Sequence, residues 1–135
     1  MKKEYSVPEL ESLFEKASIP GLKELSGTYD VLMVSGFFIF LNLLKDQKII
    51  FVNHWGYNLA RKTRWGNFFL KEREEALLID YNVSRNIFTT GIVDYIRRVK
   101  ENEYLGRFTW TFLGHEFFLG YFFLTKVKQN AAKRL

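Results

Sequence analysis

The chain contains no cysteine. Disulfide bonds, thiolate metal sites and cysteine nucleophiles are therefore excluded. Proline is almost as scarce. There are two prolines, Pro8 and Pro20, and both fall within the first twenty residues. Proline cannot donate a hydrogen bond to a strand ladder, so the proline-free remainder of the chain is compatible with long, continuous strands.

The sequence motifs of common enzyme classes are also missing. There is no Gly-x-Gly-x-x-Gly, no other phosphate-binding glycine loop and no Gly-x-Ser-x-Gly nucleophile elbow. The chain has two histidines, His54 and His115, and no carboxylate cluster at calcium-loop spacing, so we expect no dedicated metal site. Only His54 is a credible axial ligand for haem, and we expect no cofactor.

Basic residues outnumber acidic ones, 20 to 15, which gives a net charge of +5. They are scattered, with small clusters at 61–64, at 97–98 and in the tail. Scattered basic residues are typical of a solvated surface, whereas nucleic-acid binders concentrate them on one face. We expect no dedicated nucleic-acid partner, although a nucleic-acid or protein interaction module that uses basic and aromatic surface residues stays open as an alternative.

The length of 135 residues, of which 47% are hydrophobic, predicts a single domain. The first residues lead into a charged, periodic segment rather than a secretory signal, so we expect a cytoplasmic protein. The uncharged run 31–44 is shorter than the roughly 20 residues of a membrane-spanning helix, and we expect no membrane span. The oligomeric state cannot be read from the sequence.

Periodicity divides the chain into an N-terminal helix (1–21), a β-barrel (27–126) and a basic tail (127–135). Ser6 and Glu9 have the spacing of a capping box, and the apolar residues that follow recur at helical spacing. From Gly27 onward, glycines separate aromatic and β-branched segments that alternate with a period of two. The expected strands cover 28–34, 48–56, 64–71, 75–81, 92–99, 104–112 and 116–126.

These strands predict a mainly β fold: a single antiparallel up-and-down β-barrel of seven or eight strands behind one α-helix. Closure into a barrel removes the edges that an aromatic-rich open sheet would expose. Residues 37–44 fit either a strand or a short helix across one barrel mouth, and 82–90 fit a further strand. The last two strands should form a hairpin that turns at Gly114-His115.

The order of several short motifs resembles a known family. Gly27-Thr28-Tyr29 looks like the Gly-x-Trp that opens lipocalin-type (calycin) barrels, with tyrosine in place of tryptophan. The motifs that follow it are Trp55-Gly56-Tyr57, Leu78-Ile79-Asp80-Tyr81, Asp94-Tyr95-Ile96-Arg97-Arg98-Val99, Tyr104-Leu105-Gly106 and Gly120-Tyr121-Phe122-Phe123-Leu124. In order and spacing they are similar to a family of small lipocalin-like proteins named for a Gly-x-Trp-x-Gly motif. The resemblance implies a barrel that binds a ligand, and it brings no established catalytic residues.

The strand 92–99 carries the most suggestive polar residues. Tyr95 and Arg97 share one face, whereas Asp94 and Arg98 share the other, so an arginine accompanies either choice of inward face. An inward Arg97 beneath aromatic walls would suit an anionic headgroup, with Tyr81 and Asp80 to orient its guanidinium. A register-fixing ion pair, or an arginine at the barrel rim, is the structural alternative.

The sequence therefore favours a barrel that binds an apolar or amphipathic small molecule, including an anionic one such as a fatty acid. The expected ligand-binding residues are Arg97, Tyr81, Tyr95, Asp80, Trp55, His54, Tyr104, Phe108 and Trp110. An enzyme that uses the same cavity, with His54, Asp80 or Tyr104 as acid–base groups, is a second and less favoured interpretation. The sequence cannot say whether the interior is filled or hollow.

Overall fold

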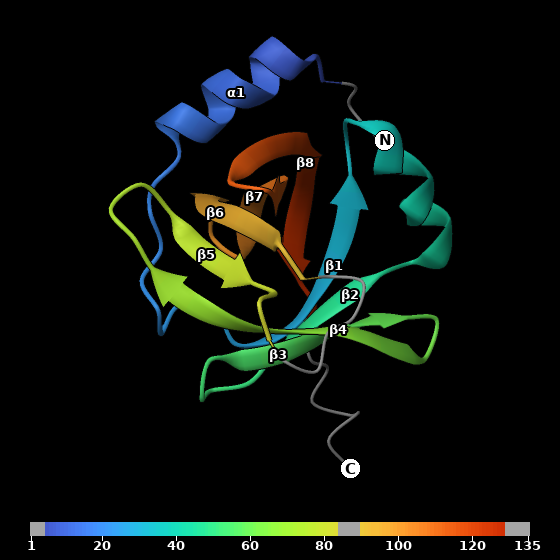
Figure 1. The fold of residues 1–135 in the computed structure, drawn as a ribbon. Coiled ribbons are helices and arrows are strands. Elements are labelled where there is room, and N and C mark those ends of the chain that lie inside the picture. Colours follow the sequence, from blue (N-terminus) through green and yellow to red (C-terminus); the bar gives the residue numbers. More distant parts are fainter. Residues whose placement is uncertain (1–4, 84–89, 129–135) are drawn as a thin grey trace.

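Eight antiparallel strands form a closed barrel, in which each strand pairs with its neighbours in sequence and β8 pairs with β1 (Figure 1). The structure is a computed structural model that describes residues 5–83 and 90–128. Its elements are α1 (Val7–Lys16), β1 (Gly27–Met33), the 3₁₀-helix η1 (Phe37–Leu44), β2 (Gln47–Ile50), β3 (Trp55–Ala60), β4 (Thr63–Glu72), β5 (Leu77–Asp80), β6 (Ile92–Lys100), β7 (Glu103–Phe112) and β8 (His115–Lys126). The predicted mainly β barrel with an N-terminal helix is confirmed.

The helix α1 begins at a capping box, as the sequence predicts. The Ser6 hydroxyl accepts from the Glu9 amide, and the Glu9 carboxylate accepts from the Ser6 amide. The helix ends earlier than expected, at Lys16, because the next residues turn back into an extended conformation. Ser18 then exchanges two backbone hydrogen bonds with Arg98 of β6, which draws the chain onto the barrel wall.

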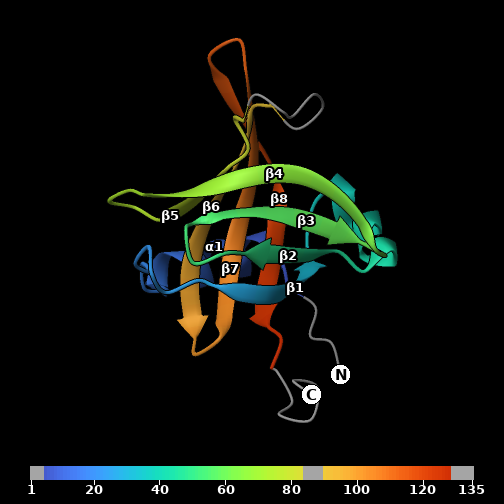
Figure 2. The same cartoon turned by 90° about the horizontal axis from the view of Figure 1, so that it is seen from below.

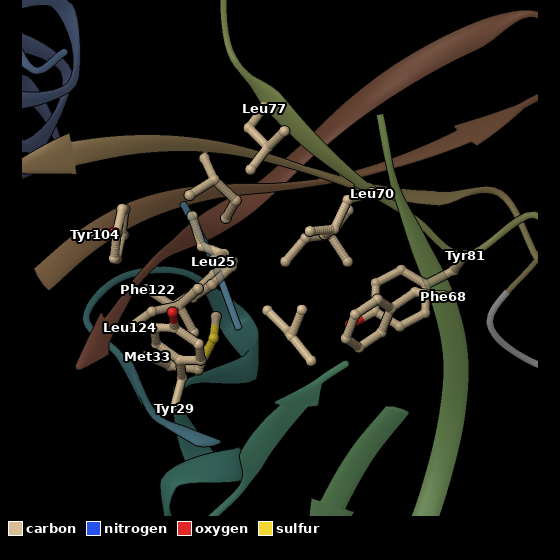
Figure 3. Close-up of a cluster of buried hydrophobic side chains, with 13 residues drawn as sticks. Leu25, Tyr29, Met33, Phe68, Leu70, Leu77, Tyr81, Tyr104, Phe122 and Leu124 are labelled. Carbon is tan, nitrogen blue, oxygen red and sulfur yellow. The ribbon is translucent and has the colours of Figure 1, made fainter. Parts of the chain in front are cut away.

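The alternation of side chains builds two separate cores. Leu10 and Phe14 of α1 pack on the outer face of the barrel, against residues such as Leu78 and Tyr121. The second core fills the barrel, where aromatic and aliphatic side chains from most strands converge (Figure 3). All four residues of β5 are buried, so both faces of this strand are shielded from solvent.

The segment 48–56, expected as one strand, is two strands and a turn. The ladder of β2 stops at Ile50 and that of β3 starts at Trp55. Between them His54 takes a positive φ of 74°, and its amide bonds back to the carbonyl of Phe51. Alternation alone does not reveal this break, since Phe51 and Val52 continue the hydrophobic run of β2 into the turn.

The run that fitted either a strand or a helix is the 3₁₀-helix η1, which lies at one mouth of the barrel. It starts after Gly36, whose φ is 94°. No side chain fits at this position, because a Cβ there would lie 2.0 Å from the Leu119 carbonyl oxygen. The Asn42 side chain bonds both the amide and the carbonyl of Met33, which ties η1 to β1. Most of the other ambiguous run, 84–89, lies outside the described residues.

The hairpin of β7 and β8 is confirmed, and its tip projects beyond the barrel (Figure 2). Its turn lies one residue earlier than expected, at Leu113 and Gly114, which both take positive φ values.

Within the described part of the chain, neither helix has the length and apolar character needed to cross a membrane.

Candidate functional site

A cluster of four polar side chains lies inside the barrel, almost wholly shielded from water. Lys48 of β2 donates to Asn58 Oδ1 at 2.8 Å and to the Tyr81 hydroxyl, and its Nζ lies 3.5 Å from Asp94 Oδ2. Asn58 Nδ2 in turn donates to the Tyr81 oxygen at 2.9 Å and to the Gly66 carbonyl at 3.2 Å. Buried charges are costly unless they are paired, and here the lysine has both a counterion and hydrogen bonds.

Strand register explains why these residues meet. Lys48 and Asn58 are direct partners in the β2–β3 ladder, so their side chains point to the same inner face. Asp94 faces inward from β6, between the inward Ile92 and Ile96. Gly66 makes room for the cluster, because a Cβ there would lie 2.9 Å from Asn58 Nδ2.

Burial sets the electrostatics of this cluster. It raises the pKa of Asp94 to about 6 and that of Tyr81 to about 12, and in both cases the Lys48 charge opposes the rise. Burial alone would lower the pKa of Lys48, but its interactions with Tyr81, Asp94 and Asp46 outweigh burial and hold that pKa above its ordinary value. Tyr81 attracts the ammonium as a charge only at high pH, where its phenol ionises. At neutral pH the cluster is therefore an ammonium–carboxylate pair beside a neutral phenol.

A small cavity of about 40 Å³ lies against this cluster, under η1. That volume has room for about three water molecules. Its lining is apolar apart from four polar side chains and comprises Val31, Met33, Leu41, Asp46, Lys48, Trp65, Tyr81, Ile92, Asp94, Phe108 and Phe122. Asp94 Oδ1 is buried, and none of the residues that the structure describes donates a hydrogen bond to it. A buried acceptor without a donor is rare and calls for an explanation.

The raised pKa of Asp94 predicts that the protein gains stability when the pH falls from 7 to 5. Folded Asp94 binds its proton with a pKa of about 6, whereas an unfolded aspartate does so near 3.9. Between these values the folded state binds more protons than the unfolded state, so stability falls as the pH rises through this window. This group should contribute about 1 kcal/mol more free energy of unfolding at pH 5 than at pH 7.

Urea unfolding at the two pH values tests this prediction. The control is the double variant Lys48→Met/Asp94→Leu, which removes the titrating carboxyl together with its partner and should lack this contribution. If wild type and the double variant change equally between pH 7 and pH 5, Asp94 has no raised pKa.

Two of the residues predicted from the sequence to bind ligand line the cavity, namely Tyr81 and Phe108. Tyr104 also points into the barrel, but it does not line the cavity, and its hydroxyl donates to Glu24 at 2.9 Å. Arg98 lies 3.6 Å from the same carboxylate, at the barrel rim.

The predicted inward position of Arg97 is wrong. Its guanidinium lies on the outer wall, 4.6 Å from the Phe14 ring centroid, and donates to the carbonyls of Phe14, Glu15 and Glu75. It thereby caps the C-terminal end of α1, where cations are favoured. Tyr95, on the same outer face, donates to Glu116.

Asp80 also faces outward rather than toward Arg97. It accepts from the amide and the side chain of Asn82 and lies 3.4 Å from Lys71 Nζ. Tyr81 enters the barrel because the β5 alternation continues for one more residue, so Asp80 and Tyr81 point to opposite sides.

The remaining three predicted residues lie away from the cavity. Trp55 is 47% exposed on the outer surface and packs beside Phe69. His54 lies in the β2–β3 turn rather than on a strand. Trp110 is half-buried on the projecting hairpin, where it stacks on Phe112 at 5.0 Å. His54 lies in the β2–β3 turn, Asp80 faces outward beside Lys71, and Tyr104 points into the barrel, so the three do not form one acid–base site.

Sequence reasoning missed Lys48, Asn58 and Asp94 as site residues. The available signal was that Asp94 alternates with Ile92 and Ile96 on one face of its strand, which is an unusual setting for a carboxylate. Its partner on β2 follows only from the pairing of strands around the barrel. No group of three or more histidines or carboxylates that could hold a metal ion occurs among residues 5–83 and 90–128.

The chain matches no protein-family model and no curated protein sequence. Its structure is similar to the crystal structure of a protein from Thermomonospora curvata, with a TM-score of 0.68 and 16% sequence identity. The similarity covers 93% of this chain and 90% of that chain. At this identity it shows a shared β-barrel fold, and the lipocalin-like family stays a prediction.

Proposed function

We propose that the barrel binds a small, mainly apolar molecule that carries a hydrogen-bond donor, in the cavity beneath η1. The observation that carries this proposal is Asp94 Oδ1, a buried carboxylate oxygen without a partner beside an otherwise apolar cavity. A hydroxyl or amino group on the ligand would supply the missing donor, and the apolar walls would take the rest of the molecule.

The charges favour a donor over the anionic headgroup expected from the sequence. Arg97 caps α1 from the outer wall and is not available inside the barrel. The three N–H groups of Lys48 face Asn58, Tyr81 and Asp94, so an incoming carboxylate would find no free cation there. Asp46 adds a second carboxylate to the cavity wall. An alcohol or an amine suits this site better than a fatty acid.

The cavity size limits the ligand unless η1 moves. About 40 Å³ accommodates only a few heavy atoms. The η1 helix contributes Leu41 to the lining, and its Phe38 ring packs edge-on against Phe108 at 5.5 Å. Longer ligands would have to displace these side chains, so affinity should depend on chain length as well as on the donor.

A matched pair of isomers tests the requirement for a donor. We expect 1-propanol to bind at least tenfold more tightly than its isomer ethyl methyl ether, because a hydrogen bond to a charged group contributes roughly 1.5–3 kcal/mol. NMR titration, followed at the amides of Val31 and Ile92, gives both dissociation constants and locates the binding in the cavity.

The double variant Lys48→Met/Asp94→Leu serves as the control, since it keeps the cavity but removes the acceptor. It should bind the alcohol and the ether with similar affinity. Equal affinities for the two isomers in wild type, or shifts that avoid the cavity residues, would contradict the proposal.

A further inference from the structure

The outward face of η1 carries four large apolar side chains that are substantially exposed in the described part of the chain. Ile39 is 48% exposed, Phe40 49%, Leu43 72% and Leu44 42%. Soluble chains rarely gather such side chains on one short element unless the surface contacts something.

Positive charge lies beside this apolar face. Lys45 follows η1 directly, and Arg61, Lys62 and Arg64 are exposed at the adjacent β3–β4 turn. The Arg61 guanidinium donates to the Leu43 carbonyl at 2.8 Å, which holds the turn against η1; Figure 2 shows the two side by side. We call these eight residues the η1 patch.

Negative charge is absent from the segments that form the patch. Residues 34–45 and 59–68 contain no aspartate or glutamate. The nearest acidic residue in sequence, Asp46, is only partly exposed and accepts from Trp65 Nε1 at 3.1 Å. Nothing in these segments therefore neutralises the four cations.

The tip of the β7–β8 hairpin is a useful contrast. It exposes a comparable apolar set that includes Phe112, Leu113 and Phe117. The charged residue beside it, Glu116, is acidic and accepts from Tyr95. Apolar exposure alone is thus common to both surfaces, and the basic surroundings distinguish the η1 patch.

We propose that the η1 patch docks on the surface of a membrane that contains anionic lipids. The apolar side chains would enter the boundary between headgroups and acyl chains, and the four cations would contact lipid phosphates and carboxylates. A second copy of the chain fits less well, because a two-fold interface would bring the same cations together. This proposal does not depend on what the cavity binds.

Sedimentation with lipid vesicles tests the proposal. Wild type should bind vesicles of 70% phosphatidylcholine and 30% phosphatidylserine, bind pure phosphatidylcholine much more weakly, and lose binding in 0.5 M salt. Leu43→Asp should weaken binding to the anionic vesicles by tenfold or more. Lys45→Gln/Lys62→Gln should weaken it roughly 25-fold, at about fivefold for each charge.

Leu113→Asp is the matched control, because it makes the same change at a similarly exposed leucine on the hairpin tip. It should bind like wild type, and all variants should keep the thermal midpoint of wild type. The proposal is overturned if wild type does not sediment with anionic vesicles, binds neutral vesicles equally well, or loses as much binding through Leu113→Asp as through Leu43→Asp. A dimer that Leu43→Asp dissociates, without vesicle binding, would assign the patch to a second copy instead.

Discussion

Lys48→Met is expected to lower the free energy of unfolding by about 3–5 kcal/mol, the usual loss when one partner of a buried ion pair is removed. The Asp94 carboxylate would then lie 2% exposed with no cation beside it. Asn58 Oδ1 and the Tyr81 hydroxyl would lose the ammonium that donates to them. Each of these groups is inside the barrel, where water cannot replace the lysine.

The matching change on the other strand, Asp94→Leu, should cost a similar amount, because it leaves the ammonium of Lys48 unpaired. Leucine has the same number of side-chain heavy atoms as aspartate, so packing is nearly conserved. In the double variant no isolated charge remains, and it should lose much less stability than the sum of the single changes.

Urea unfolding of the four proteins gives the coupling energy directly. We expect a coupling of several kcal/mol, with m-values that stay constant across the set. Additive losses would mean that Lys48 and Asp94 do not interact in the folded protein. The mixed cluster would then have to be explained by the hydrogen bonds of Asn58 and Tyr81 alone.

Strand periodicity was sufficient for most of the fold because side-chain alternation is a local property. It located β4, β6, β7 and β8 to within one or two residues. It failed where a local backbone conformation interrupts a hydrophobic run, as at His54 between β2 and β3. The choice between strand and helix for η1 depended on Gly36, whose close approach to Leu119 appears only in the folded chain.

The site was harder to predict, because an inner and an outer face of β6 look alike in the sequence. Both faces carry apolar residues, because the inner face packs in the barrel core and the outer face packs in the core beneath α1. The position of Arg97 is decided by carbonyl groups at the end of α1, more than 80 residues away in sequence. Lys48 and Asp94 likewise meet only through the closed strand order.

Phe122→Ala should turn the small cavity into one that accepts an aromatic ring. The Phe122 ring lies against Gly106, where a Cβ would come within 2.2 Å of it, and lines the cavity that Asp94 also lines. Its removal should cost about 3–5 kcal/mol, and engineered apolar cavities of about 150 Å³ bind benzene.

The stability lost through Phe122→Ala should be partly restored by benzyl alcohol, whose ring replaces the missing side chain and whose hydroxyl can reach Asp94. Toluene, which lacks the hydroxyl, should restore less, and the difference appears as a shift of the thermal midpoint at equal ligand concentration.

Phe123→Ala is the control. Phe123 is the next residue and also a phenylalanine, but it packs outside the barrel, where its ring centroid lies 5.5 Å from that of Tyr5. That variant should lose stability without being rescued by either compound. Equal rescue of both variants would place the ligand outside the barrel, whereas equal rescue of Phe122→Ala by toluene and benzyl alcohol would show that Asp94 takes no part in recognition.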